Sequence, residues 1–189
     1  YSFKVVKNLL EDCGLRVLDV QMNSINGGSF AVTASKKDSS HVTNKPIVNW
    51  LLKQEDEMEL DTIKPYIEFK DRVFKHRKSL IDLIEALVAD GKKVIGYGAS
   101  TKGNVLLQFC NFNSKQIPFI AEVNEEKFGK FTPGTNIPII SEEESRDMMP
   151  DYYFVLPWAF FDEMYKREEE WRSKGGKFIV PFPEFKVVD

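Results

Sequence analysis

The stretch KVIGYGASTKGNVLLQFC, Lys93–Cys110, holds an apolar run, a glycine-rich turn and a helical pattern in direct succession. The apolar run KVIGYG predicts a buried strand, and NVLLQFC predicts a helix. Glycines between the two allow a tight turn and a close approach of the main chain to another group. The stretch therefore predicts one strand–turn–helix unit of a parallel α/β sheet.

The glycine-rich turn matches neither of two standard nucleotide-binding templates. After Gly96 and Gly98, the dinucleotide pattern Gly-x-Gly-x-x-Gly needs a third glycine where Thr101 stands. The Walker pattern fits Gly98 and Gly103, but it needs a lysine where Asn104 follows. The turn is similar to a phosphate-binding loop without belonging to either class.

Strand-like and helix-like segments alternate on both sides of this unit. A long amphipathic helix is expected from Tyr66 to Asp90, and Gly91 ends it. The later strand-like runs are IPFIAEV (117–123), IPII (137–140), DYYFVLPW (151–158) and KFIVPFP (177–183), and the later helical runs are SEEESRDMM (141–149) and FFDEMYKREEEWRSKG (160–175). This alternation predicts an α/β fold, with a Rossmann-like, mostly parallel sheet flanked by helices, over residues 67–189.

Residues 1–37 predict a helix followed by a β-hairpin. The helical pattern of residues 1–13 stops at Gly14, and LRVLDVQM (15–22) and SFAVTAS (29–35) alternate as strands. This unit is too small to hold a core alone, so we expect either the edge of a domain whose other strands are missing or an appendage. Because the chain opens with Tyr1 in a helical pattern, we also expect a piece of a longer protein.

The polar stretch KKDSSHVTNK, Lys36–Lys45, is rich in turn-forming residues, and we assign residues 38–66 as a linker. His41 lies in this stretch and His76 lies in the long helix, and both are expected to be exposed rather than to bind a ligand. Cys13 and Cys110 are far apart in helical patterns. We expect them to be buried free thiols in a reducing compartment, which favours a cytoplasmic protein.

Composition excludes several classes of protein. The chain has 189 residues, of which 42% are apolar and 29% charged, so it is long enough for one good core or two small ones. Its net charge of -3 argues against a general nucleic-acid binder, which needs a basic face. No apolar stretch approaches the roughly 20 residues that span a bilayer, so no membrane partner is expected.

The loops after parallel strands are where open α/β sheets bind ligands. In the glycine loop, Gly98 permits close approach and the amides near Gly103 and Asn104, at the start of a helix, suit a phosphate. Hydroxyl donors and one positive charge come from Ser100, Thr101 and Lys102. The alternative is a plain strand-to-helix turn with incidental polar residues.

Three further loops contribute candidates. Glu122 ends the second strand of the sheet, where nucleotide-binding folds accept ribose hydroxyls, and Lys127 follows in the same loop. Gly134 and Thr135 lie in a turn that could border the same cleft or be a plain surface turn. Trp158 follows another strand and could stack on a base or a sugar.

No residue of the chain is a convincing catalytic group. The sequence offers no Ser/His/Asp order, no Cys paired with a His and no carboxylate cluster for a metal. The acidic runs EEES (142–145) and REEE (167–170) are expected to face water. We therefore expect this segment to bind or position a substrate and to leave the chemistry to another part of the protein.

Four ordered motifs carry a family resemblance: GYGASTKGNVLLQFC, FGKFTPGTNIPI, PDYYFVLPW and GGKFIVPFP. Together they resemble the C-terminal domain of the S-adenosylmethionine-dependent sugar C-methyltransferases, which show a Tyr-Gly-Ala-x-x-Lys-Gly-Asn loop and a Pro-Gly-Thr turn. Glu122 departs from the family's more frequent Asp but keeps the carboxylate. The residues that match the loop and the turn are Tyr97, Gly98, Ala99, Lys102, Gly103, Asn104, Pro133, Gly134 and Thr135.

The resemblance implies a three-part protein of which this chain holds the end. Residues 1–37 are similar to the last helix and hairpin of a class I methyltransferase domain. S-adenosylmethionine, the zinc-binding segment and the catalytic residues would lie upstream, with no metal in this segment. The implied substrate is a nucleotide-linked keto sugar, held between the central domain and residues 67–189. The isolated chain would have no methyltransferase activity.

Two other interpretations remain open. One is a non-catalytic α/β domain that docks onto the methyltransferase domain or forms homodimer contacts, with an empty glycine loop. The other is an independent NAD-binding dehydrogenase domain, which the failed glycine spacing disfavours.

Overall fold

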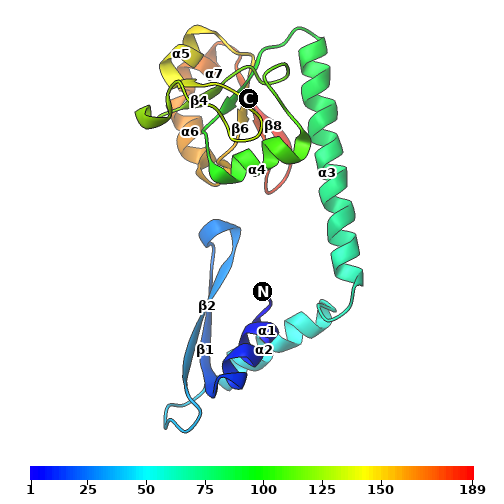
Figure 1. Cartoon of the computed structure of the whole chain (residues 1–189), viewed down its shortest axis with the longest axis vertical. Coiled ribbons are helices and arrows are strands. Elements are labelled where there is room, and N and C mark those ends of the chain that lie inside the picture. Colours follow the sequence, from blue (N-terminus) through cyan, green and yellow to red (C-terminus); the bar gives the residue numbers. More distant parts are fainter. The chain divides into compact units, whose positions relative to one another are not determined.

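The computed structural model describes residues 1–189, apart from the side chain of Asn26. The chain separates into two compact units, Tyr1–Arg72 and Val73–Asp189, and each is described by itself. Their boundary lies six residues beyond the end of the predicted linker, inside helix α3 (Lys64–Ala89) (Figure 1). The predicted linker, 38–66, also contains a regular helix, α2 (Lys45–Glu57).

The first unit packs two helices on a two-stranded antiparallel sheet. Helix α1 (Phe3–Asp12) is followed by strands β1 (Leu15–Asn23) and β2 (Ser29–Lys36), with a 3-10 turn, η1 (Ile25–Gly27), between them. Phe30 and Val32 of β2 are partly buried against the core. The buried core side chains come from α1, β1 and α2: Phe3, Val17, Val20, Val48 and Leu51.

Helix α2 is tied to α1 by a buried carboxylate. Glu55 of α2 accepts hydrogen bonds from the main-chain amides of Phe3 and Lys4, the first two residues of α1. A negative charge at a helix N-terminus is stabilised by the free amides and by the helix dipole. The apolar residues Val48 and Leu51 complete the contact, so residues 45–57 belong to the first unit's core rather than to a free linker.

The second unit contains a six-stranded sheet in the order β5-β4-β3-β6-β7-β8. The first five of these strands are parallel, and β8 is antiparallel to β7. The strands are β3 (Val94–Tyr97), β4 (Ile120–Glu122), β5 (Ile139–Ser141), β6 (Tyr152–Val155), β7 (Lys177–Val180) and β8 (Lys186–Val188). This confirms the predicted fold class, a largely parallel sheet flanked by helices, and β8 is a strand that the sequence patterns did not reveal.

Helices cover both faces of this sheet (Figure 1). The part of α3 in this unit and α4 (Thr101–Cys110) pack on one face, around Phe154 of the central strand β6. On the other face, α6 (Phe161–Arg167) and α7 (Glu169–Ser173) pack around Tyr153. The short helix α5 (Glu142–Asp147) follows β5, and 3-10 turns lie at η2 (Glu125–Lys127) and η3 (Trp158–Phe160).

Three local predictions were wrong. The single helix expected over 160–175 is broken at Glu168, whose side chain is buried. Cys13 is exposed, because it is the C-terminal cap of α1 rather than part of its apolar face, while Cys110 is buried as expected. His76 is half-buried rather than exposed, since its ring stacks on Phe182 at 4.6 Å.

No helix among the described residues is both long and apolar enough to cross a bilayer.

The packing around β6 makes a first prediction. Phe154 is fully buried and contacts the ring of Phe112, with ring centroids 6.0 Å apart. Phe154→Ala is expected to lower the free energy of unfolding by about 3–5 kcal/mol, because it removes apolar contacts and leaves a cavity. Phe160→Ala is the control, since Phe160 is 60% exposed, and it should change the value by less than about 0.5 kcal/mol. Urea denaturation measures both, and equal effects would contradict the assigned core.

Candidate functional site

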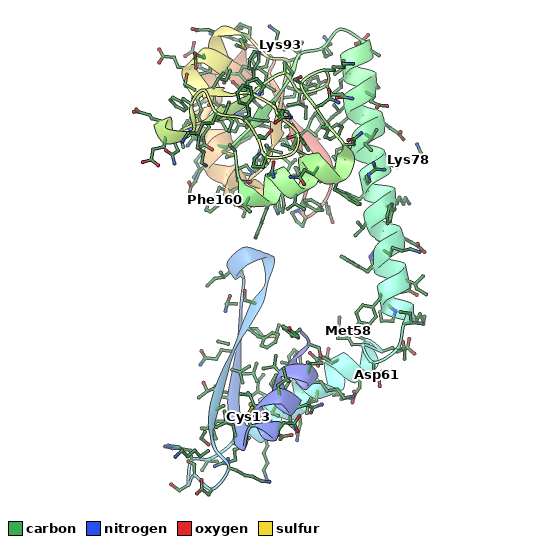
Figure 2. All side chains as sticks on the ribbon, viewed as in Figure 1. Cys13, Met58, Asp61, Lys78, Lys93 and Phe160 are labelled. Carbon is green, nitrogen blue, oxygen red and sulfur yellow. The ribbon has the colours of Figure 1, made fainter. Side chains whose placement is uncertain are left out.

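The carboxyl ends of β3, β4 and β6 lie at one edge of the parallel sheet. Figure 2 shows Lys93, just before β3, and Phe160, which follows β6, at opposite ends of the second unit. The loop after β3, the loop after β4 and the segment after β6 therefore meet on the side of Phe160. Open α/β sheets place their ligand sites at this edge.

Glu122 and Lys127 hold the glycine loop in place, and we call them the Glu122–Lys127 clamp. One carboxylate oxygen of Glu122, Oε2, accepts from the Ala99 amide at 2.8 Å and from the Lys127 ammonium at 3.1 Å. The other, Oε1, accepts from the amides of Val123 and Asn124 at 2.9 and 3.0 Å. Lys127 also donates to the Ala99 carbonyl at 3.0 Å. The loop is thus bound to the end of β4 through both main-chain groups of Ala99.

This hydrogen bonding keeps Glu122 charged. Burial alone would raise the pKa of the Glu122 carboxyl, since only 7% of the residue is exposed. The bonds from the Asn124 and Val123 amides and the ammonium of Lys127 outweigh burial, and they lower the pKa below its ordinary value. The carboxylate has four donors already, so it holds the loop, and the proposed role of accepting ribose hydroxyls would require it to give up some of them.

The loop glycines are required by packing within the protein. Gly98 has a φ of +84°, and a Cβ there would lie 2.5 Å from the Pro157 side chain. A Cβ on Gly103 would lie 2.3 Å from Cβ of Leu156. Both neighbours belong to the segment after β6, so these glycines let the loop and the start of α4 approach that segment closely.

The start of α4 uses both of the amides that were predicted to hold a phosphate. Ser100 is the N-terminal cap, and its hydroxyl accepts from the Gly103 amide at 3.0 Å. The Asn104 amide donates to the Ser100 carbonyl at 2.9 Å. A ligand at this end of α4 would therefore meet side chains rather than the amides of Gly103 and Asn104.

Two pockets flank the loop. The first, which we call the loop pocket, has a volume of about 300 Å³ and lies over α4 and the turn that follows η2, with Asn104, Lys130 and Phe131 in its wall. The second, the edge pocket, has a volume of about 270 Å³ and lies beside Gly98 and the start of α6. Ala99, Ser100 and Lys127 line both pockets, so the clamped loop is the wall between them.

The structure brings part of the predicted site together at these pockets. The predicted residues that line one or both of them are Gly98, Ala99, Ser100, Thr101, Asn104, Glu122 and Lys127. Lys102 is exposed in the first turn of α4 and lines neither pocket, while Gly103 is buried against Leu156. The positive charges that do line the loop pocket are Lys127 and Lys130.

The other predicted residues are engaged elsewhere. Tyr97 is fully buried and donates its hydroxyl to Glu168 at 2.5 Å, and burial followed by this contact raises its pKa far above the ordinary value. Trp158 packs on Phe182, with ring centroids 4.7 Å apart, and lines neither pocket. Within the Pro-Gly-Thr turn, Thr135 bonds to a neighbouring threonine and Gly134 lies against the Gln108 side chain.

A buried charge network near the edge pocket was missed in the sequence. The acidic runs were expected to face water, but Glu168 is only 1% exposed and Glu142 is 11% exposed at its side chain. Arg146 bonds to both carboxylates, and Arg167 bonds to Glu142 at 2.7 Å. Only the spacing of Glu142 and Arg146, one helical turn apart, is a signal visible in the sequence.

A comparison with known protein families identifies the family of this chain. The family model described as the C-methyltransferase C-terminal domain matches residues 24–183. The chain belongs to this family. The match confirms the resemblance drawn from the four motifs.

A curated relative is similar over the whole chain. It is the C-methyltransferase NovU of Streptomyces niveus, which is 38% identical over 188 residues. The aligned region covers 100% of this chain and 44% of the relative, so the chain spans less than half the length of that protein.

The Glu122–Lys127 clamp predicts a pH-dependent loss of stability. Glu122→Gln is expected to lower the free energy of unfolding by about 2 kcal/mol at pH 7, because it removes hydrogen bonds to a charged group. The folded pKa lies below the ordinary value of 4.5, so the carboxylate's contribution is present above pH 4.5 and is lost as the pH falls through the folded pKa. Thermal unfolding of both proteins between pH 3 and 7 measures this, and a difference that stays constant over that range would contradict it.

Proposed function

We propose that this chain is the C-terminal part of an S-adenosylmethionine-dependent C-methyltransferase that acts on a nucleotide-linked keto sugar. Its role is to position the nucleotide-sugar, while the catalytic groups lie in an upstream domain. Methyl transfer is supported by membership of the C-methyltransferase C-terminal domain family and by the similarity to NovU, a C-methyltransferase. The substrate class rests on the motif resemblance and on the chemistry of the two pockets.

The pockets offer groups that suit a nucleotide diphosphate. Lys130 is exposed at the wall of the loop pocket and Lys127 lines both pockets, so positive charge borders the clamped loop on each side. Phe131 is 60% exposed at the same wall and presents a flat apolar surface. The amide oxygen of Asn104 is buried, and no described residue donates to it. A heteroaromatic ring with an N–H group and a linked diphosphate matches this set of contacts.

The loop does not fit S-adenosylmethionine in the manner of a dinucleotide fold. Close main-chain approach to a cofactor is prevented at Gly98 and Gly103, since Pro157 and Leu156 occupy the space that glycine leaves. The carboxylate that would hold ribose hydroxyls, Glu122, has four donors from the protein. We therefore assign cofactor binding to the upstream domain and derive no step of methyl transfer from these residues.

The upstream domain and this chain have different roles in the proposed reaction. When bound upstream, S-adenosylmethionine supplies an electrophilic methyl group, which an enolate formed next to the keto group of the sugar can attack. This chain binds the nucleotide portion, orients the keto sugar toward the upstream domain and helps to exclude water. Holding two reactants in a fixed relative orientation is itself a large part of catalysis. The cytoplasmic location that we propose rests on the two free thiols.

Lys130 provides the direct test of the loop pocket. In the full-length enzyme, Lys130→Ala is expected to weaken the binding of uridine or thymidine diphosphate by about three- to fivefold, because one exposed charge near the phosphates is lost. Isothermal titration calorimetry measures the dissociation constants.

Lys115→Ala is the matched control for Lys130→Ala. Lys115 is also exposed, but its side chain lines neither the loop pocket nor the edge pocket. Its substitution removes the same net charge and should leave the dissociation constant unchanged within about twofold. Equal losses in both variants would mean that only the overall charge matters, and wild-type enzyme without measurable affinity for either diphosphate would refute the proposal.

The chain by itself is expected to transfer no methyl group. Purified residues 1–189, supplied with S-adenosylmethionine and a nucleotide-linked keto sugar, should give no methylated sugar by mass spectrometry, because neither a cofactor site nor a catalytic base is assigned to them. The full-length enzyme under the same conditions is the positive control. Turnover by the chain alone would show that catalytic groups lie within it.

A further inference from the structure

Arg167 is the last residue of α6, and its side chain lines the edge pocket opposite the glycine loop. We propose that Arg167 is a substrate-positioning residue that exchanges its partner Glu142 for a phosphate group bound in the edge pocket. This inference rests on the proposed function, because it names the residue that would hold one end of the diphosphate.

The present contacts of Arg167 leave part of its guanidinium available. Nη2 donates to Glu142 at 2.7 Å, and Nε approaches the Tyr97 hydroxyl at 3.4 Å, which is a long hydrogen bond. Within the described residues, Nη1 has no hydrogen-bond partner. The side chain is 40% exposed. An arginine with an open edge beside a pocket can bind a phosphate through two parallel N–H groups.

Release of Arg167 would leave Glu142 with one cationic partner, Arg146, which it would share with Glu168. Glu142 also bonds to Arg146 at 2.8 Å through its other oxygen. Arg146 in turn binds Glu168 through two nitrogens. Breaking a buried ion pair is costly when it strands one partner, and here Glu142 keeps a cation. The exchange therefore costs the partly exposed Arg167–Glu142 ion pair and leaves Arg146 shared by two carboxylates, and the contact with the phosphate has to offset this cost.

The other cation of the edge pocket is less free to move. Lys127 is fixed between Glu122 and the Ala99 carbonyl, and its departure would release the loop. The charge of Glu122 is balanced by Lys127, and three main-chain amides also donate to its carboxylate. The lining carboxylate with no partner among the described residues is Glu163, one helical turn before Arg167 on α6 and exposed to solvent. The negative charge of Glu163 opposes anion binding in the edge pocket. Removal of this charge should therefore strengthen anion binding.

The test compares a nucleoside diphosphate with its nucleoside in the full-length enzyme. Uridine and thymidine diphosphate are titrated by calorimetry, and the one that binds more tightly is paired with its own nucleoside. Arg167→Gln is expected to weaken diphosphate binding about tenfold and nucleoside binding by less than twofold, because only the phosphate contact is lost. Arg167→Lys, which keeps the charge but loses the planar fork, should give an intermediate loss of about threefold.

Two variants on the same helix sharpen this comparison. Lys166→Gln removes the same charge from the neighbouring exposed position, which lines neither pocket, and should change the diphosphate affinity by less than twofold. Glu163→Gln should tighten diphosphate binding by about twofold, since it removes a repulsive charge. If Arg167→Gln fails to fold, as judged by circular dichroism, the diphosphate affinities of Arg167→Lys and Glu163→Gln test the role of Arg167 instead.

The outcomes separate this inference from the proposed function. Unchanged diphosphate affinity in both Arg167 variants, together with a loss in Lys130→Ala, would refute the role of Arg167 and leave the proposed function standing. Equal losses for diphosphate and nucleoside would assign Arg167 a purely structural role and refute the inference as well. A wild-type enzyme that binds neither diphosphate would refute both.

Discussion

The carboxylate of Glu122 is the contact on which the rest of the site depends. It receives three main-chain amides and the ammonium of Lys127, and it thereby fixes the loop after β3 against the loop after β4. Charge-assisted bonds of this kind are stronger than neutral ones, and here the carboxylate that accepts them is buried. The fixed loop becomes a rigid wall with one pocket on each side, which is a suitable support for a ligand that must be held still.

This arrangement shifts recognition from the main chain to side chains. In a dinucleotide fold, the glycines let the cofactor approach the backbone, whereas here Gly98 and Gly103 let the loop approach Pro157 and Leu156. The polar groups that face the pockets therefore come from the surrounding elements, above all Lys130 and the guanidinium of Arg167. The same α/β scaffold can in this way serve a substrate-holding role without a nucleotide fingerprint.

The sequence predicted the sheet well because its signals are local. Apolar runs and glycine stops mark β3, β4, β6 and β7, and the order of elements determines a parallel sheet. The site was harder to predict from the sequence, because the burial of Glu142 and Glu168 depends on helices that come together from distant segments. An acidic run on a short helix has the same local pattern whether it faces water or an arginine. The packing roles of Gly98 and Gly103 likewise depend on the segment after β6, more than fifty residues away in the chain.

The most direct measurement is a crystal structure of the full-length enzyme with a nucleotide-linked sugar. We expect the diphosphate to lie against the clamped loop, with its oxygens within hydrogen-bonding distance of side chains of the loop pocket or the edge pocket. The hydrogen bonds that join Ala99 to Glu122 and to Lys127 should remain intact. A nucleotide-sugar bound entirely within the upstream domain, with both pockets filled by water, would contradict it.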